Sequence, residues 1–191
     1  LDMDLLNDYF INHGVTHTMI PTQVAKLFME SVEDTSLNVL LVGGEKLGEF
    51  VNDNEYELVD GFGPTETFAF ISSIKNSQKI DFSSIGVPNY NTKFYILDEE
   101  MRCVPFGAVG ELYVAGFQVA NGYLNRADEN RRAFIDNPFE DDEDYGILYR
   151  TGDLVRFLSD GSLSIVGRSD SQVKIRGNRV ELSEIESVIQ E

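Results

Sequence analysis

The apolar residues of the first third of the chain alternate between helical and strand spacing, and this alternation constrains the fold more than any other feature. Near the N-terminus, large apolar side chains fall on one face of a helix: Leu5, Leu6, Tyr9 and Phe10. Gly14 suits the end of that helix, and residues 16–20 predict a short strand that Pro21 stops. We expect a second helix to follow, with Thr22 as its N-terminal cap.

Two further strands in this region end at glycines. Residues 39–42 are an apolar run rich in β-branched side chains, of the kind that is buried on both faces of a parallel sheet. Residues 57–60 repeat the arrangement before a glycine-rich turn. Helices that alternate with such strands indicate an α/β arrangement. We therefore predict a partial parallel-sheet α/β subdomain over residues 1–84.

The pattern changes after residue 84 to short strands separated by glycines. The predicted strands are 93–97, 111–115, 148–150, 155–158 and 163–166, with one helix near 128–134. Gly161 lies in a hairpin turn, where its freedom to adopt positive φ is useful. Short strands joined by tight turns favour a mostly antiparallel, β-barrel-like subdomain, which we place at 85–168.

The last segment, 169–191, begins with a polar junction and ends in a helical pattern. Ser183 and Glu186 form an S-x-x-E capping box, which predicts that a helix starts there. The pattern still reads as a helix at Glu191. We interpret the chain as a piece of a longer protein, and the segment as the start of another domain.

The charge of the chain disfavours nucleic acid as a partner. Thirty-three acidic residues against fifteen basic ones give a formal net charge of −18, which would repel a phosphate backbone. No apolar run approaches the roughly 20 residues that span a bilayer, and residues 1–10 lack the basic start of a signal peptide. We therefore expect no membrane association and a cytoplasmic location.

Cysteine and histidine contribute little to the predicted chemistry. Cys103 is the only cysteine, which excludes an intrachain disulfide, and we interpret it as a small core residue. His13 and His17 have no third ligand nearby, so we place them at a helix end and a strand start rather than at a zinc site. The acidic run 140–144 is interpreted as a solvated loop rather than a metal site.

Four ordered blocks carry the functional signal. They are DGFGPTET at 60–67, GELYVAGFQVANGYL at 110–124, YRTGDL at 149–154 and GRSDSQVKIRGNRVELSEIE at 167–186. In this order and spacing they resemble the adenylate-forming enzymes, most closely the amino-acid adenylation domains of nonribosomal peptide synthetases. The resemblance implies a ligase that forms aminoacyl-AMP from ATP and an amino acid. It also implies a partner, a peptidyl carrier protein whose phosphopantetheine thiol accepts the aminoacyl group.

The first block is the nucleotide loop in this resemblance. It implies that Phe62 stacks on adenine, that Thr65 hydrogen-bonds the α-phosphate and that Glu66 holds Mg²⁺. Phe62 stands where tyrosine is commoner, a change that preserves the stacking ring. The alternative is a Gly-Pro turn with an exposed threonine and glutamate.

The residues that lead into this loop are also assigned to nucleotide binding by the resemblance. They are Asp60, Gly61 and Gly63. Asp60 stands where asparagine is commoner, but its carboxylate can still accept from the adenine amino group. Ligands in open α/β sheets bind at the carboxyl ends of strands, which is where this loop is expected.

The third and fourth blocks imply a ribose site. Asp153 would accept hydrogen bonds from both ribose hydroxyls, and Arg168 would reach the same ribose. The alternatives are an aspartate that caps a turn and an exposed cation at a strand end. Both alternatives remain open from the residues alone.

Asp170 corresponds to the hinge between the large domain and a small C-terminal domain, which rotates between the two steps. The hairpin after it contains Lys174, Arg176 and Gly177, which the resemblance places at the active site in the thioester-forming step. An ordinary basic hairpin is the alternative. The block 110–124 is assigned mainly to structure, with Asn121 where arginine is frequent, and no catalytic role is inferred for it.

An acyl pocket is assigned by alignment on the flanking blocks. Its lining would be Thr18, Leu41, Gly43, Gly61, Ala69 and Phe70. Most of these are small or apolar, which favours a substrate with an uncharged side chain. Core packing is an equally good account of the apolar members, and the substrate is left unassigned.

Two other functions are kept as alternatives. One is a D-alanine carrier-protein ligase or an acyl-CoA synthetase from the same superfamily. The other is a noncatalytic nucleotide-binding or interaction module. The 191 residues contain neither the phosphate loop nor the late lysine of the superfamily, so we expect the isolated chain not to adenylate a substrate.

Overall fold

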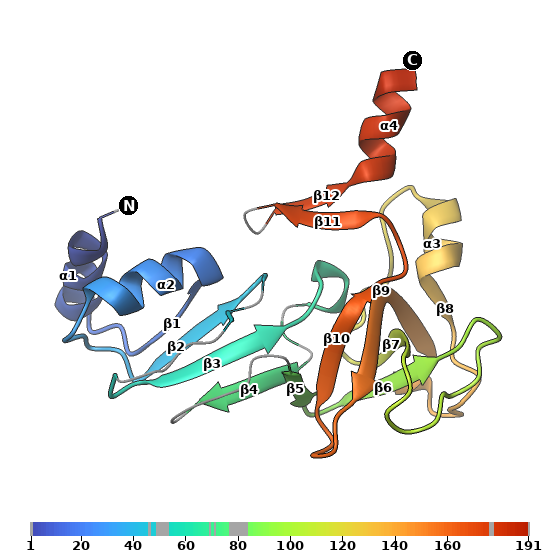
Figure 1. Cartoon of the computed structure of the whole chain (residues 1–191), viewed down its shortest axis with the longest axis horizontal. Coiled ribbons are helices and arrows are strands. Elements are labelled where there is room, and N and C mark those ends of the chain that lie inside the picture. Colours follow the sequence, from blue (N-terminus) through green and yellow to red (C-terminus); the bar gives the residue numbers. More distant parts are fainter. Residues whose placement is uncertain are drawn as a thin grey trace. The chain divides into compact units, whose positions relative to one another are not determined.

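In the computed structural model the chain forms two compact units, and Figure 1 shows its helices and strands in chain order by colour. The first unit comprises Leu1–Gly61, Ile74–Ser83 and Gln172–Glu191, and the second comprises Phe62–Ser73 and Ser84–Ser171. The structure describes residues 2–45, 47–48, 54–68, 70, 72–76, 84–175 and 178–190.

A three-stranded parallel sheet is the centre of the first unit. Its strands are β1 (His17–Pro21), β2 (Val39–Gly43) and β3 (Glu57–Phe62), in the order β1-β2-β3. The register aligns Met19 with Leu41 and Leu41 with Val59, so Gly43 pairs with Gly61 near the carboxyl ends of β2 and β3. The predicted parallel arrangement is confirmed.

Two helices also contribute to the apolar core of this unit, α1 (Met3–His13) and α2 (Thr22–Ser31). Phe28 and Leu40 are completely buried in that core. The carboxylate of Asp2 caps α1 by accepting from Leu5 N, and Gly14 ends the helix with φ of 62°. His13 therefore ends α1 as predicted, and His17 begins β1.

The predicted cap at Thr22 is wrong. The residue lies inside α2, whose preceding residue Pro21 makes no side-chain capping bond. The hydroxyl of Thr22 donates instead to the carbonyl oxygens of Gly43 and Glu45, each at 3.1 Å. Gly43 is the last residue of β2 and Glu45 follows it, so the hydroxyl bonds the end of a strand rather than the start of its own helix.

An antiparallel sheet dominates the second unit, with strand order β5-β10-β9-β7-β6. These strands are β5 (Ser84–Pro88), β6 (Thr92–Leu97), β7 (Gly110–Gly116), β9 (Ile147–Phe157) and β10 (Leu163–Arg168). β8 (Phe134–Asp136) pairs with β9, and Ser72 and Ser73 of β4 (Ser72–Asn76) pair with β5. The unit also contains α3 (Ala127–Ala133) and two 3₁₀ turns, η1 (Thr65–Thr67) and η2 (Glu143–Tyr145). The predicted change from parallel to antiparallel strands is confirmed.

β9 is one strand of 11 residues, where two separate strands were expected. The register shifts opposite its middle, between Glu111 and Tyr113 of β7. The hydroxyl of Thr151 donates to Leu112 O at 2.8 Å and accepts from Asp153 N at 3.0 Å. These bonds continue the strand pairing across the irregularity. Gly152, which lies between the two expected strands, is therefore inside one bulged strand.

Cys103 is exposed, which contradicts its interpretation as a core residue. It forms an isolated antiparallel bridge with Leu97, just after the turn in which Asp98 N donates to Arg102 O at 2.9 Å. Leu97 is only 1% exposed and fills the core at this point. Cys103 therefore does not contribute to the packing of the core.

The chain ends in a two-stranded hairpin followed by a helix. β11 (Gln172–Ile175) pairs antiparallel with β12 (Asn178–Glu181), and α4 (Leu182–Gln190) follows. The helix begins one residue before the predicted cap. Among the helices within the described residues, none combines the length and apolar character that a membrane span requires.

The predicted boundaries between the subdomains, at residues 84 and 168, stay predictions.

Candidate functional site

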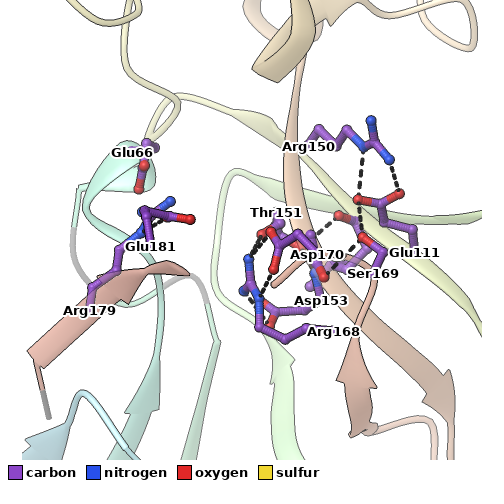
Figure 2. Close-up of polar contacts among 12 residues, drawn as sticks. Glu66, Glu111, Arg150, Thr151, Asp153, Arg168, Ser169, Asp170, Arg179 and Glu181 are labelled. Atoms are coloured by element: carbon purple, nitrogen blue, oxygen red, sulfur yellow. Dashed lines mark hydrogen bonds and ion pairs between the residues drawn. The ribbon is translucent and has the colours of Figure 1, made fainter. Parts of the chain in front are cut away.

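Arg168 organises a cluster of charged groups in the second unit (Figure 2). The antiparallel register of β10 and β9 places Arg168 opposite Asp153, and Nη1 donates to Asp153 Oδ1 at 2.8 Å. Nε and Nη2 donate to the two carboxylate oxygens of Asp170 at 2.7 and 2.6 Å. Nη2 also donates to the carbonyl of Thr151 at 3.1 Å. The predicted ribose and hinge residues are thus joined through one guanidinium.

Two of the three charged side chains in this cluster are shielded from solvent, whereas Asp170 is exposed. Asp153 is 8% exposed, and the side chain of Arg168 is 22% exposed. Burial alone would lower the pKa of Arg168, but its hydrogen bond to Asp170 and the charge of Asp153 outweigh that effect and raise the pKa. The guanidinium therefore remains charged, as a buried carboxylate requires of its partner.

Gly152 provides the space for this cluster. A Cβ atom there would lie 2.5 Å from Asp170 Oδ2 and 2.6 Å from Arg168 Nη2. Its φ of 75° also lies in the left-handed region that disfavours side chains. Gly152 is therefore required for two reasons: its backbone adopts a left-handed conformation, and a side chain there would collide with Arg168 and Asp170.

A second set of bonds anchors Ser169, between Arg168 and Asp170. Arg150 donates to both carboxylate oxygens of Glu111 at 2.8 Å, and the hydroxyl of Ser169 donates to Glu111 Oε1 at 3.1 Å. The backbone N–H of Ser169 donates to Gly152 O at 2.8 Å. No role was predicted for Glu111, because its partners lie 39 and 58 residues away and only the folded structure brings them together.

In the predicted nucleotide loop, Thr65 and Glu66 differ in burial. Thr65 is exposed in η1, whereas Glu66 is 7% exposed. Tyr123 OH donates to Glu66 Oε1 at 2.6 Å, and Ala120 N donates to Glu66 O at 2.8 Å. A turn with an exposed glutamate is therefore excluded. Tyr123 was not predicted as a site residue, because it belongs to the block assigned to structure.

The residues before η1 lie on β3 and just after it. Asp60 is half-buried, and burial raises the pKa of its carboxyl to about 6. Gly61 is buried and pairs with Gly43. Phe62 packs partly buried against the apolar cluster of the second unit, and Gly63 is half-buried. The assignment of these residues to nucleotide binding stays a prediction.

Four residues of the predicted acyl pocket lie on the parallel sheet and divide between its two faces. Leu41 and Gly43 are two apart on β2 and share a face, and Gly61 is aligned with Gly43. Thr18 is aligned with Leu40, so its side chain lies on the opposite face from Leu41. In the second unit, Phe70 is half-buried, and Ala69 lies outside the described residues. The pocket stays a prediction.

The predicted thioester-step hairpin is formed by β11 and β12. Lys174 is aligned with Arg179 in the ladder. Arg176 and Gly177 lie outside the described residues. Asp170 is in the bend between β10 and β11, where a hinge residue is expected.

Comparison with known proteins identifies the family. The family model described as AMP-binding enzyme matches residues 1–124. The chain belongs to this family. It is 48% identical over 97% of its length to Surfactin synthase subunit 2 of Bacillus subtilis (strain 168), and 42% identical over 98% to Bacitracin synthase 1 of Bacillus licheniformis. It spans about 5% and 4% of those two relatives.

Solved structures agree with this assignment. The whole chain matches 35% of the holo form of an NRPS protein containing adenylation and PCP domains, with a TM-score of 0.86 and 27% identity. It also matches 37% of an artificially fused adenylation-PCP didomain from Klebsiella oxytoca, with a TM-score of 0.80; at 24% identity this match shows the fold alone. The resemblance to adenylation domains of nonribosomal peptide synthetases is confirmed. The roles of individual residues are a separate question.

Proposed function

We propose that the chain is part of an amino-acid-activating ligase that forms aminoacyl-AMP and transfers the aminoacyl group to a carrier-protein phosphopantetheine thiol. The observation that carries the proposal is the buried carboxylate of Asp153, held at 2.8 Å by Arg168 in a member of the AMP-binding enzyme family. A buried acidic side chain held by a cation at a strand pair is a rigid acceptor for ligand hydroxyls.

The proposed reaction has two steps. In the first, a carboxylate oxygen of the amino acid attacks the α-phosphorus of ATP, and the bond to the leaving pyrophosphate breaks. In the second, the phosphopantetheine thiolate attacks the acyl carbon, and AMP leaves. Both steps depend mainly on positioning and on donors directed at negative charge.

Thr65 and Glu66 are the proposed loop residues of the first step. The exposed hydroxyl of Thr65 is available to donate to the α-phosphate. Mg²⁺ at nucleotide sites takes one or two protein carboxylates together with phosphate oxygens and water, and it neutralises phosphate charge when bound. Within the described residues there is no cluster of three or more acidic, histidine or cysteine ligands. One buried carboxylate, that of Glu66, fits such a shared site.

Asp153 and Arg168 are the proposed ribose residues. A carboxylate has two acceptor oxygens, which suits the two vicinal hydroxyls of a ribose. Arg168 fixes the orientation of that carboxylate and, through Asp170, links it to the proposed hinge. Phe62, Asp60, Gly61 and Gly63 complete the proposed nucleotide site, with the ring of Phe62 against adenine.

The thioester step is assigned to the hairpin that follows Asp170. Rotation about this hinge would bring Lys174, Arg176 and Gly177 to the thiol. The substrate pocket is assigned to Leu41, Gly43, Gly61, Ala69 and Phe70. Their small and apolar character supports an amino acid with an uncharged side chain. Thr18 faces the other side of the sheet from Leu41 and is not assigned to it.

Asp153→Ala in the intact protein tests the proposal. We expect at least a tenfold loss of AMP affinity by calorimetry, since two hydrogen bonds to a charged acceptor are removed. Amino-acid-dependent pyrophosphate exchange should fall in parallel. Asp160→Ala is the matched control, because Asp160 lies in the exposed hairpin turn of the same unit and should change neither readout. Unchanged AMP binding in Asp153→Ala would refute the ribose site.

The same assay separates the alternative functions. Nucleotide binding by the intact protein without exchange for any amino or fatty acid would favour a noncatalytic module. Exchange with fatty acids alone would favour an acyl-CoA synthetase. The isolated 191-residue chain is expected to show no exchange, which stays a prediction.

A further inference from the structure

The hydroxyl of Tyr123 makes the shortest described bond to the proposed metal ligand. It donates to Glu66 Oε1 at 2.6 Å, across 57 residues of sequence. A hydroxyl that donates to a carboxylate at this distance forms a strong, charge-assisted hydrogen bond. Glu66 is 7% exposed, so little water competes for this oxygen.

Tyr123 is itself held on both sides of its backbone. Asn130 Oδ1 accepts from Tyr123 N at 2.6 Å, and Asn130 Nδ2 donates to Tyr123 O at 2.8 Å. The ring lies edge-on to Phe134, with ring centres 5.4 Å apart and planes at 72°. One side chain of α3 therefore clamps the peptide groups of Tyr123, while the ring packing fixes the direction of its hydroxyl.

The residues before Tyr123 complete the arrangement. Gly122 has φ of 124°, and a Cβ atom there would lie 2.8 Å from Asn130 Oδ1. Ala120 N donates to the backbone oxygen of Glu66 at 2.8 Å. Residues 120–123 therefore contact both the backbone and the side chain of Glu66. A loop serving only to connect β7 with α3 does not require both contacts.

We propose that Tyr123 is a positioning residue for Glu66 and that Asn130 positions Tyr123. The inference rests on the proposed function, in which Glu66 holds Mg²⁺ together with the nucleotide phosphates. The hydrogen bond fixes the rotation of the carboxylate before the metal arrives, so that less ordering is needed on binding. The block 110–124, assigned above to structure, then contributes to the metal site through Tyr123.

Tyr123→Phe in the intact protein removes the hydroxyl and keeps the ring. We expect Mn²⁺, used as a probe in the presence of a nonhydrolysable ATP analogue, to bind 3–30-fold more weakly by electron paramagnetic resonance. The apparent Mg²⁺ requirement of pyrophosphate exchange should rise by the same factor. Asn130→Ala should shift both values in the same direction by a smaller factor.

Tyr95→Phe is the matched control. It also removes a hydroxyl that donates to a carboxylate in the second unit, Glu140 Oε1 at 3.2 Å. This change should leave Mn²⁺ binding as in the wild type. A general loss of stability in Tyr123→Phe is distinguished by combining it with Glu66→Gln. If the hydroxyl acts through Glu66, Tyr123→Phe should have no further effect on Mn²⁺ binding in the Glu66→Gln background.

The outcomes separate the two proposals. Wild-type Mn²⁺ affinity in Tyr123→Phe, together with weakened affinity in Glu66→Gln, would overturn the positioning role and leave the proposed function standing. Equal effects of Tyr123→Phe with and without Glu66→Gln would also overturn it. Absence of exchange and of nucleotide binding in the wild type would instead refute the proposed function.

Discussion

The two units bury different kinds of side chain. The main core cluster of the first unit is apolar throughout and includes Phe28, Leu40 and Leu58, all fully buried. In the second unit, the buried residues include the charged side chains of Glu66 and Asp153. In the first unit, one face of the parallel strands carries the fully buried Leu40, Val42 and Leu58, whereas in the second unit a bulged antiparallel sheet can direct polar side chains to fixed partners. The first unit therefore relies on packing and the second on packing together with paired charge.

The pairing in the second unit depends on local irregularity. The register shift opposite the middle of β9 occurs where Thr151, Gly152 and Asp153 meet the neighbouring strands. In the first unit, the described register of β1, β2 and β3 is regular. The regular strands of the first unit form an apolar core, whereas the irregular strands of the second unit orient the polar groups of the candidate site.

The largest expected effect is on the apolar core of the first unit. Phe28→Ala should lower the free energy of unfolding by about 3–5 kcal/mol, because a completely buried aromatic ring is replaced by a cavity. Hydrogen exchange should show the loss of protection in β2. Leu27→Ala, at a neighbouring residue that is 48% exposed, is the control and should cost much less. Similar costs for the two variants would contradict the account of this core.

An intermediate effect is expected from the paired charge of the second unit. Arg168→Ala leaves the buried carboxylate of Asp153 without this cation and should cost about 2–3 kcal/mol of unfolding free energy. Hydrogen exchange of β9 and β10 should report it. Arg102→Ala is the control, since Arg102 makes ion pairs with its side chain 70% exposed and should cost less than about 1 kcal/mol. If both variants lose the same stability, burial is not what distinguishes the Arg168 cluster.

The smallest effect concerns Asp60, the half-buried carboxyl of β3. Burial raises its pKa from 3.8 to about 6, so the folded protein holds this proton more tightly than the unfolded chain does. This contribution to stability is complete below pH about 4 and is lost as the pH rises through 6. Asp60→Asn should therefore raise the unfolding free energy by about 1–2 kcal/mol at pH 7, allowing for partial exposure.

The pH itself supplies the control for Asp60→Asn. At pH 4 the wild-type carboxyl is largely protonated in the folded state, so the advantage of the variant should nearly vanish there. Urea denaturation followed by circular dichroism at both pH values measures the difference. An advantage that is the same at pH 4 and pH 7 would show that desolvation of the carboxylate is not its cause.

Much of the secondary structure was predictable because its signals are local. The strand expected at 39–42 is observed as Val39–Gly43, and the helix expected to end near Gly14 does so with a left-handed glycine. The error at β9 arose because the glycine in YRTGDL suggests a break, whereas the pairing of β9 with both β7 and β10 carries the strand through it. The exposure of Cys103 also depends on tertiary structure, because its bridge partner Leu97 fills the core at that point.

The resemblance named candidate site residues but not their arrangement, and their roles stay predictions. The resemblance named Glu66, Asp153, Arg168 and Asp170. It did not indicate that Arg168 joins both aspartates, or that Tyr123 bonds Glu66. No local pattern distinguishes a tyrosine hydroxyl that reaches a carboxylate 57 residues away from one that points into solvent.

By itself, the sequence determined the family, the order of the elements and the change from parallel to antiparallel strands. Apolar spacing, turn residues and ordered blocks act over short distances along the chain, so they can be read without coordinates. Only the tertiary structure decided the hydrogen-bond partners: Arg168 with Asp153 and Asp170, and Tyr123 with Glu66. These partners depend on strand register and loop position, which are set by packing of the whole unit rather than by neighbouring residues.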